Sequence, residues 1–131
     1  TSCAPVFAQR AAIEALRRTD EVTPAIVTHL RQCRDTLVPL LQAVLGVQTT
    51  AAPGGMYAFF RLQGHTDSLE TAKRLVREAG LGLAPGAAFD PDPAAASAAW
   101  LRWCFASRDL SRLAQGVERL RGWLAGQGAR G

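Results

Sequence analysis

The sequence predicts an α+β fold in which a small, mostly antiparallel sheet packs against helices as a two-layer sandwich. Stretches with apolar residues at every third or fourth position alternate with short stretches rich in aromatic and β-branched residues. Clusters of proline and glycine separate these stretches, and no internal repeat or long linker divides the chain. A length of 131 residues with 48% hydrophobic residues is sufficient for one domain with its own core.

The leading segment, residues 1–45, predicts two helices, of which the first is short. Ser2 is a candidate cap for this helix, and Pro5 lies near its first turn. Ile13 and Leu16 fall on one side of it, among residues that form helices well.

The second helix is longer and starts at about Glu21, with Pro24 in its first turn. Helical spacing predicts one buried stripe made of Ile26, Leu30, Cys33, Leu37, Leu41 and Val44. Pro39 should kink or break the helix, because its ring removes a backbone donor and clashes with the preceding turn. Gly46 is expected to end it.

The rest of the chain, residues 46–131, is expected to form the small α+β domain. Val47–Thr50 and Tyr57–Leu62 flank the turn signal Pro53-Gly54-Gly55, and together they predict a hairpin. Two more strands are predicted, at Gly80–Ala84 and at Leu101–Phe105.

Two further helices complete the predicted domain. The third helix should begin at Asp67, which has Glu70 three residues later, and end at Gly80. Its predicted buried residues are Leu69, Ala72, Leu75, Val76 and Ala79. A last helix from about Asp109 should bury Leu110, Leu113, Val117, Leu120 and Leu124.

Arg102 is an arginine in an otherwise apolar strand. Side chains alternate along a strand, so Arg102 and Cys104 should share one face, and the large apolar residues should share the other: Leu101, Trp103 and Phe105. A guanidinium keeps its charge, so in apolar surroundings it needs an anionic partner. One interpretation is a ligand carboxylate, which matches the planar fork of donors. The other is an internal ion pair with Asp90, Asp92 or Glu14.

Composition excludes several classes of function. The net charge is +4, but the arginines are scattered, so we expect a solvated basic surface and no nucleic-acid partner. No apolar run approaches the roughly 20 residues of a membrane span, so no membrane partner is expected. Cys3, Cys33 and Cys104 lack the spacing of a metal site or a disulfide framework, which favours reduced thiols in a cytoplasm.

Other candidate catalytic residues are weak. Lys73, the single lysine of the chain, falls on a polar helix face and is expected to be solvated. His29 and His65 are interpreted as surface residues, and Ser107 and Ser111 as helix caps or surface residues.

Four motifs occur in order before the closing amphipathic helix: RQCRDTLV at 31–38, PGGMYAFF at 53–60, GLGLAPGAAF at 80–89 and LRWCFA at 101–106. Their order resembles the C-terminal part of fold-type I, class I and II aminotransferases, the aspartate aminotransferase-like enzymes that use pyridoxal phosphate. The opening TSCAPVFAQRAAIEAL resembles the segment before the long interdomain helix of that family.

The resemblance implies roles for a few residues. Arg102 matches the arginine that binds the α-carboxylate of the substrate, and Pro85, Gly86 and Phe89 match the turn and the aromatic residue beside the site. Tyr57 is interpreted as structural. The sequence after Phe89 departs from the family, because Asp-Pro-Asp-Pro stands where a glycine is usual.

The resemblance also implies that the cofactor site lies outside this chain. The lysine that forms the Schiff base and the groups that hold pyridoxal phosphate precede the matched region in the family. We therefore expect no catalytic, cofactor-binding or metal-binding residue here, a start at Thr1 that is a cut end, and no activity of the chain alone. The full-length enzyme is expected to be a cytoplasmic homodimer that exchanges amino groups between amino acids and 2-oxo acids.

Three alternatives remain open at this stage. A related pyridoxal phosphate lyase could contain the same domain. A transcription regulator could carry it after a DNA-binding module. The chain could also be a stand-alone module that binds small carboxylates.

Overall fold

The structure, a computed structural model, describes residues 3–50, 52–90, 92 and 96–128. In chain order, its elements are α1 (Val6–Arg17), α2 (Thr19–Gln42), β1 (Val47–Thr49), β2 (Tyr57–Leu62), α3 (Ser68–Arg74), a π-helical turn (Leu75–Ala79), β3 (Ala84–Pro85), a 3₁₀ turn (Gly86–Phe89), a second 3₁₀ turn (Ala96–Ala99), β4 (Trp100–Cys104) and α4 (Leu110–Gly128). Within these residues, the strands form one antiparallel sheet with the order β1-β2-β4-β3. The α+β class is confirmed.

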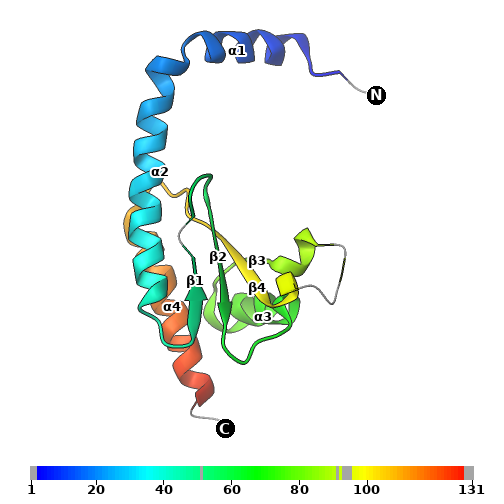
Figure 1. Ribbon diagram of the computed structural model, residues 1–131, viewed down its shortest axis with the longest axis vertical. Coiled ribbons are helices and arrows are strands. Elements are labelled where there is room, and N and C mark those ends of the chain that lie inside the picture. The colour runs from blue at the N-terminus through cyan, green and yellow to red at the C-terminus, as the bar shows by residue number, and fades with distance from the viewer. Residues whose placement is uncertain (1–2, 51, 91, 93–95, 129–131) are drawn as a thin grey trace.

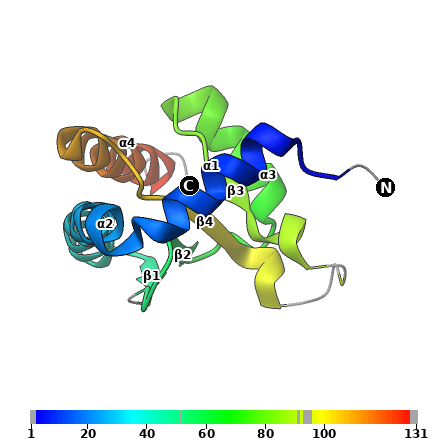
Figure 2. The ribbon, with the colours of Figure 1, turned by 90° about the horizontal axis from the view of Figure 1, so that it is seen from above.

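One face of the sheet is buried and the other is open. The alternation predicted for the last strand is confirmed, since Leu101, Trp103 and Phe105 are buried. They join buried residues of β2, α2, α3, the π-helical turn and α4 in one core, whose other large members include Leu37, Leu41, Phe60, Leu75, Leu113, Val117, Leu120 and Trp123. Figures 1 and 2 show α2, α3 and α4 packed against the sheet. The opposite face therefore stays available for other contacts.

The helix α2 differs from the prediction at both ends. It begins at Thr19, and it continues through Pro39 to Gln42, so of the predicted kink or break at Pro39 the break does not occur. The proline removes a single backbone donor, and the carbonyl of Pro39 itself still accepts from the amide of Ala43 at 3.1 Å. Buried Leu37, Val38 and Leu41 surround this position, so packing outweighs the lost hydrogen bond.

The N-terminal half of α2 and all of α1 extend away from the sheet (Figure 1). Ile26 was predicted to be buried, but it is 57% exposed, because this half of α2 projects beyond the core. No residue of α1 is buried, and its apolar side chains Phe7, Ile13 and Leu16 face solvent. The candidate cap Ser2 lies outside the described residues.

The start and end of the third helix are confirmed. The carboxylate of Asp67 accepts from the backbone amide of Glu70 at 2.9 Å, and Gly80 ends the segment with φ +62°. Its buried face is only partly as predicted, because Leu69 and Val76 are 48% and 53% exposed. In their place, α3 buries the polar residues Ser68 and Thr71.

The predicted strand at Gly80–Ala84 is much shorter, because only Ala84 and Pro85 pair with β4. The last helix is confirmed, but Leu110, which was predicted to be buried, is 36% exposed. At the other end of this helix Trp123 is buried instead. A Cβ added to Gly116 would lie 2.6 Å from the ring of Trp103, so α4 lies directly on β4 at this point.

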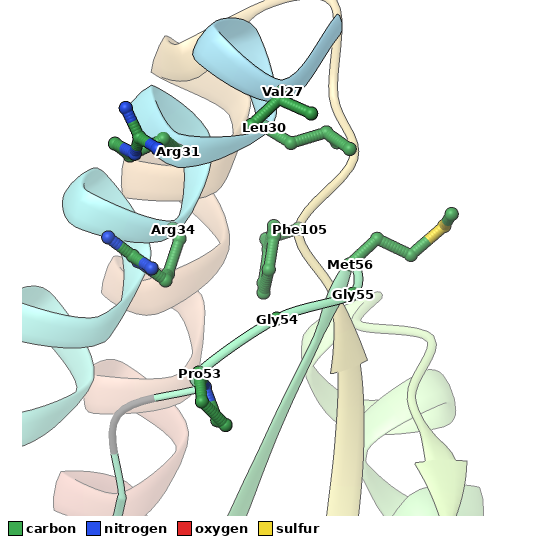
Figure 3. A pocket seen from close by; sticks show the side chains of 9 residues that line it. All are labelled: Val27, Leu30, Arg31, Arg34, Pro53, Gly54, Gly55, Met56 and Phe105. Atoms are coloured by element: carbon green, nitrogen blue, oxygen red, sulfur yellow. The ribbon is translucent and has the colours of Figure 1, made fainter. Parts of the chain in front are cut away.

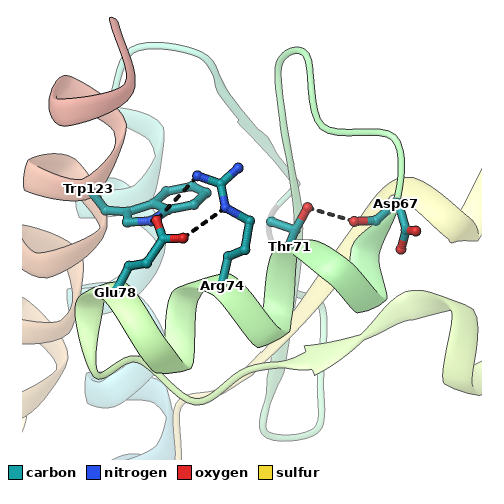
Figure 4. Close-up of polar contacts among 5 residues, drawn as sticks. All are labelled: Asp67, Thr71, Arg74, Glu78 and Trp123. Carbon is teal, nitrogen blue, oxygen red and sulfur yellow. Dashed lines mark hydrogen bonds and ion pairs between the residues drawn. The ribbon is translucent and has the colours of Figure 1, made fainter. Parts of the chain in front are cut away.

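A polar cluster joins the π-helical turn to α4 (Figure 4). The indole Nε1 of Trp123 donates to Glu78 at 2.7 Å, and Arg74 pairs with the same carboxylate at 3.0 Å. The guanidinium of Arg74 also lies 5.1 Å from the centroid of the Trp123 ring. His65 lies on that ring at a centroid distance of 5.3 Å. His65 was predicted to be a surface residue, but it is half-buried here.

Replacing the capping residue should weaken the third helix. Asp67→Ala leaves the amide of Glu70 without its carboxylate acceptor and should lower the free energy of unfolding by about 1 kcal/mol. Urea denaturation measures this change. Asp20→Ala is the matched control, since Asp20 lies in the first turn of α2, whose N-terminus has no side-chain cap. Equal losses in the two variants would contradict the capping role.

The His65 cluster should make stability depend on pH. Burial lowers the pKa of His65 below its usual 6.5, and the nearby Arg74 guanidinium lowers this pKa further. The unfolded chain then binds a proton more readily, so stability is full above pH 6.5 and falls as the pH drops through the lower folded pKa. Denaturation of the parent and of His65→Gln at pH 8 and at pH 5.5 tests this. An equal pH dependence in both proteins would contradict it.

Candidate functional site

Arg102 lies in the middle of the sheet on its open face. The strand β4 lies between β2 and β3, and Arg102 is in register with Phe59 on one side and Ala84 on the other. Its side chain is half-buried. The large apolar side chains on the other face of β4 hold the strand in the core, so the backbone position of Arg102 is fixed by the fold.

Two aromatic rings contact the guanidinium of Arg102. Its Cζ atom lies 4.1 Å from the centroid of the Tyr57 ring and 4.0 Å from that of the Phe89 ring. Tyr57 comes from β2 and Phe89 follows β3, so the rings belong to elements on opposite sides of β4. Both distances are within the range of a cation–aromatic attraction.

The internal ion pair proposed for Arg102 is absent from the part of the chain that the structure describes. Within these residues, no carboxylate lies within 4.0 Å of its guanidinium. Asp90 instead accepts from the hydroxyl of Ser97 at 2.9 Å and from the amide of Asp92 at 3.0 Å. The in-plane N–H donors of Arg102 therefore make no hydrogen bond with a described residue.

The turn after β3 brings the other expected site residues beside Arg102. Pro85 is half-buried and pairs with Leu101 of β4. Gly86 is buried, and a Cβ added there would lie 2.3 Å from the carbonyl oxygen of Ser97. The turn ends at Phe89, whose ring is 49% exposed. A hydrogen bond of 3.2 Å from the amide of Ala87 to Ser68 Oγ fastens this turn to α3.

A cavity that the sequence did not predict lies between α2 and the loop before β2 (Figure 3). It has a volume of about 320 Å³, and its lining is Val27, Leu30, Arg31, Arg34, Pro53, Gly54, Gly55, Met56 and Phe105. Arg34 forms an ion pair with Asp35 at 2.8 Å and donates to the carbonyl of Ala52 at 3.5 Å. Arg31 and Arg34 are three residues apart in RQCR, so they face the same side of a helix. This spacing is the sequence signal that could have indicated them.

Other candidate residues have structural contacts. Lys73 is exposed, as predicted, and its Nζ lies 4.0 Å from Glu70. His29 is half-buried and not at the surface, since its Nε2 lies 2.7 Å from the carbonyl oxygen of Ser107. The buried thiol of Cys33 donates to the same carbonyl at 3.4 Å. These two contacts fasten α2 to the connection between β4 and α4.

Within the described residues, no group of three or more His, Cys, Asp and Glu side chains is arranged to bind a metal ion. The three cysteines Cys3, Cys33 and Cys104 are free thiols. No helix in the described ranges is long and apolar enough to cross a membrane.

Sequence comparison identifies the family. The sequence model for "Aminotransferase class I and II" matches residues 1–120 of this chain. The chain belongs to the class I and II aminotransferases. The resemblance seen in the motifs is thus confirmed over most of the sequence.

Two aminotransferases are similar to this chain in sequence. The aspartate aminotransferase of Thermotoga maritima is 29% identical over 124 residues, which are 95% of this chain and 29% of that protein. The asparagine–oxo-acid transaminase of Streptococcus mutans is 32% identical over 95 residues, covering 68% of this chain and 24% of that protein. The chain therefore spans less than a third of the length of these aminotransferases.

Solved aminotransferases have the same fold in the matched region. The crystal structure of the Thermotoga maritima enzyme superposes with a TM-score of 0.76 at 28% identity, over 95% of this chain and 30% of that one. An aminotransferase from Mycobacterium tuberculosis gives a TM-score of 0.78 at 26% identity, over 95% and 32%. The small antiparallel sheet with its helices is thus an aminotransferase fold.

The close packing at Gly86 should make this position intolerant of a side chain. Gly86→Ala would force the 3₁₀ turn away from the carbonyl groups of Ser97 and Trp100, and it should destabilise the protein by about 1–3 kcal/mol. Thermal denaturation measures the loss. Gly82→Ala is the control, because its added Cβ would meet no atom within 4 Å. A Gly86→Ala protein as stable as the Gly82→Ala protein would contradict this packing.

Proposed function

We propose that this chain is the C-terminal part of a pyridoxal phosphate-dependent aminotransferase, in which Arg102 binds the α-carboxylate of the amino acid. The single observation that carries the proposal is the state of the Arg102 guanidinium. It is half-buried and held between two rings, and its donors make no hydrogen bond to a described residue. A charged fork of this kind is matched by a carboxylate, which accepts two parallel N–H···O bonds.

The surroundings of Arg102 suit a small organic anion. Tyr57, Phe59 and Phe89 are each 38–49% exposed on the open face of the sheet, so they offer apolar contacts beside the charge. Partial burial strengthens a charge-assisted hydrogen bond relative to one in bulk water, and each such bond contributes about 1.5–3 kcal/mol. An amino acid or a 2-oxo acid has the required carboxylate, and it also has a reactive carbon next to that carboxylate.

The residues of this chain do not fit the cofactor. A Schiff base needs a lysine, and the only lysine in the sequence is Lys73, which is exposed beside Glu70 on α3. We therefore assign pyridoxal phosphate to the part of the enzyme outside residues 1–131, and we expect this chain alone to be inactive. In the same proposal, residues 1–45 lead into the small domain formed by residues 46–131, and the whole enzyme is a cytoplasmic homodimer.

The contribution of this chain to the reaction is then orientation. Arg102 lies on the central strand of a packed sheet, so a carboxylate bound to it has a fixed position relative to the rest of the enzyme. Holding one end of a small substrate converts an encounter into an intramolecular step and raises the effective concentration of its reacting end. Transfer of the amino group itself is assigned to the cofactor when it is bound.

Loss of the guanidinium should weaken the reaction of amino acid substrates. In the full-length enzyme, Arg102→Ala should lower kcat/KM at least roughly thirtyfold, because the paired hydrogen bonds to the carboxylate are lost; this corresponds to about 2 kcal/mol of transition-state stabilisation. Steady-state kinetics with several amino acids measures this change.

The matched control is Arg61→Ala. Arg61 lies on the same face and is also stacked on a ring, that of Trp100 at 5.7 Å, but it already donates to Gln48 at 2.6 Å. This variant should change kcat/KM less than twofold. An unchanged kcat/KM in Arg102→Ala would reject the assignment of Arg102.

A further inference from the structure

We propose that Tyr57 is a positioning residue for Arg102, and that its ring, together with the ring of Phe89, holds the guanidinium so that its donors stay free for the substrate. The inference rests on the proposed function of Arg102. It changes the interpretation of Tyr57, which the sequence indicated only as structural.

An arginine side chain that binds a ligand must itself be held in place. A long, flexible side chain must lose its rotamer freedom before it can bind a ligand in one geometry. A buried charge is normally paired with an opposite charge, but a carboxylate partner would occupy the same N–H groups that a substrate needs. Within the described residues, Arg102 has no such partner, and its guanidinium instead contacts two rings, whose centroids lie 4.1 and 4.0 Å from its Cζ atom.

Stacking differs from ion pairing in the part of the guanidinium that it uses. An aromatic ring contacts the flat face of the guanidinium. The N–H groups of the guanidinium, in contrast, point outward in its plane and donate their hydrogen bonds in that plane. Contacts to Tyr57 and Phe89 can therefore restrict Arg102 without consuming a donor. Because the two rings come from elements on opposite sides of β4, they also oppose movement of the side chain in either direction across the sheet.

The ring of Tyr57, and not its hydroxyl, is the group that should matter. Its hydroxyl makes no hydrogen bond with any residue in the described part of the chain. The side chain is 38% exposed and lies on the face of β2 away from the core. Removing the ring should therefore disturb the mobility of Arg102 without opening a cavity in the core.

The experiment uses the full-length holoenzyme and 3-phenylpropionate, a carboxylate without an amino group, as a competitive inhibitor. Tyr57→Leu should raise the inhibition constant and the KM for amino acids about fivefold, with kcat changed less than twofold. Tyr57→Phe keeps the ring and should behave like the parent. Phe89→Leu should repeat the effect of Tyr57→Leu from the other side of the guanidinium.

Trp100→Leu is the matched control. Trp100 lies on the same face of β4 as Arg102, but its ring contacts the guanidinium of Arg61 at 5.7 Å. This variant should leave the inhibition constant within twofold of the parent value. Melting temperatures of all variants measure any general loss of structure.

The outcomes separate the two proposals. If Arg102→Ala weakens the inhibitor but Tyr57→Leu and Phe89→Leu do not, the positioning role is overturned and the carboxylate site stands. If Tyr57→Phe raises the inhibition constant as much as Tyr57→Leu does, the hydroxyl of Tyr57 is the group that matters and the role of its ring is overturned. If Arg102→Ala leaves the inhibition constant unchanged, the proposed function itself fails.

Discussion

The burial of one face of β4 is the constraint on which the rest of this structure depends. Leu101, Trp103 and Phe105 anchor the strand in the core, and close contact between Trp103 and Gly116 sets α4 directly against it. Since side chains alternate along a strand, fixing these three residues also fixes where Arg102 lies. The same packing thus supplies stability on one face of the sheet and places a charged residue on the other.

Much of the fold followed from local patterns that tertiary packing did not override. The hairpin, the cap at Asp67 and the alternation around Arg102 all depend on neighbouring residues, and all are present in the structure. The errors arose where distant contacts decide the outcome. Helix α2 continues through Pro39 because the surrounding core holds it, and Ile26 is exposed because its half of the helix extends past the sheet.

The candidate site was predicted in part. The strand pattern and the family resemblance both selected Arg102, but neither could show that Tyr57 and Phe89 contact it, because these rings come from different elements. Their meeting depends on the strand order, in which β4 lies between β2 and β3. The cavity lined by Arg31 and Arg34 was missed for the same reason, since its other wall is a loop distant in sequence.

The strand order also determines when during folding the site can form. The strand that carries Arg102 pairs with β2, although α3, β3 and both 3₁₀ turns lie between them in sequence. Such a pairing requires closure of a long loop, which costs chain entropy before any contact compensates for it. The aromatic rings and the guanidinium therefore meet only once the central strand has been inserted. A nascent or partly folded chain would contain every residue of the candidate site and yet not bring them together.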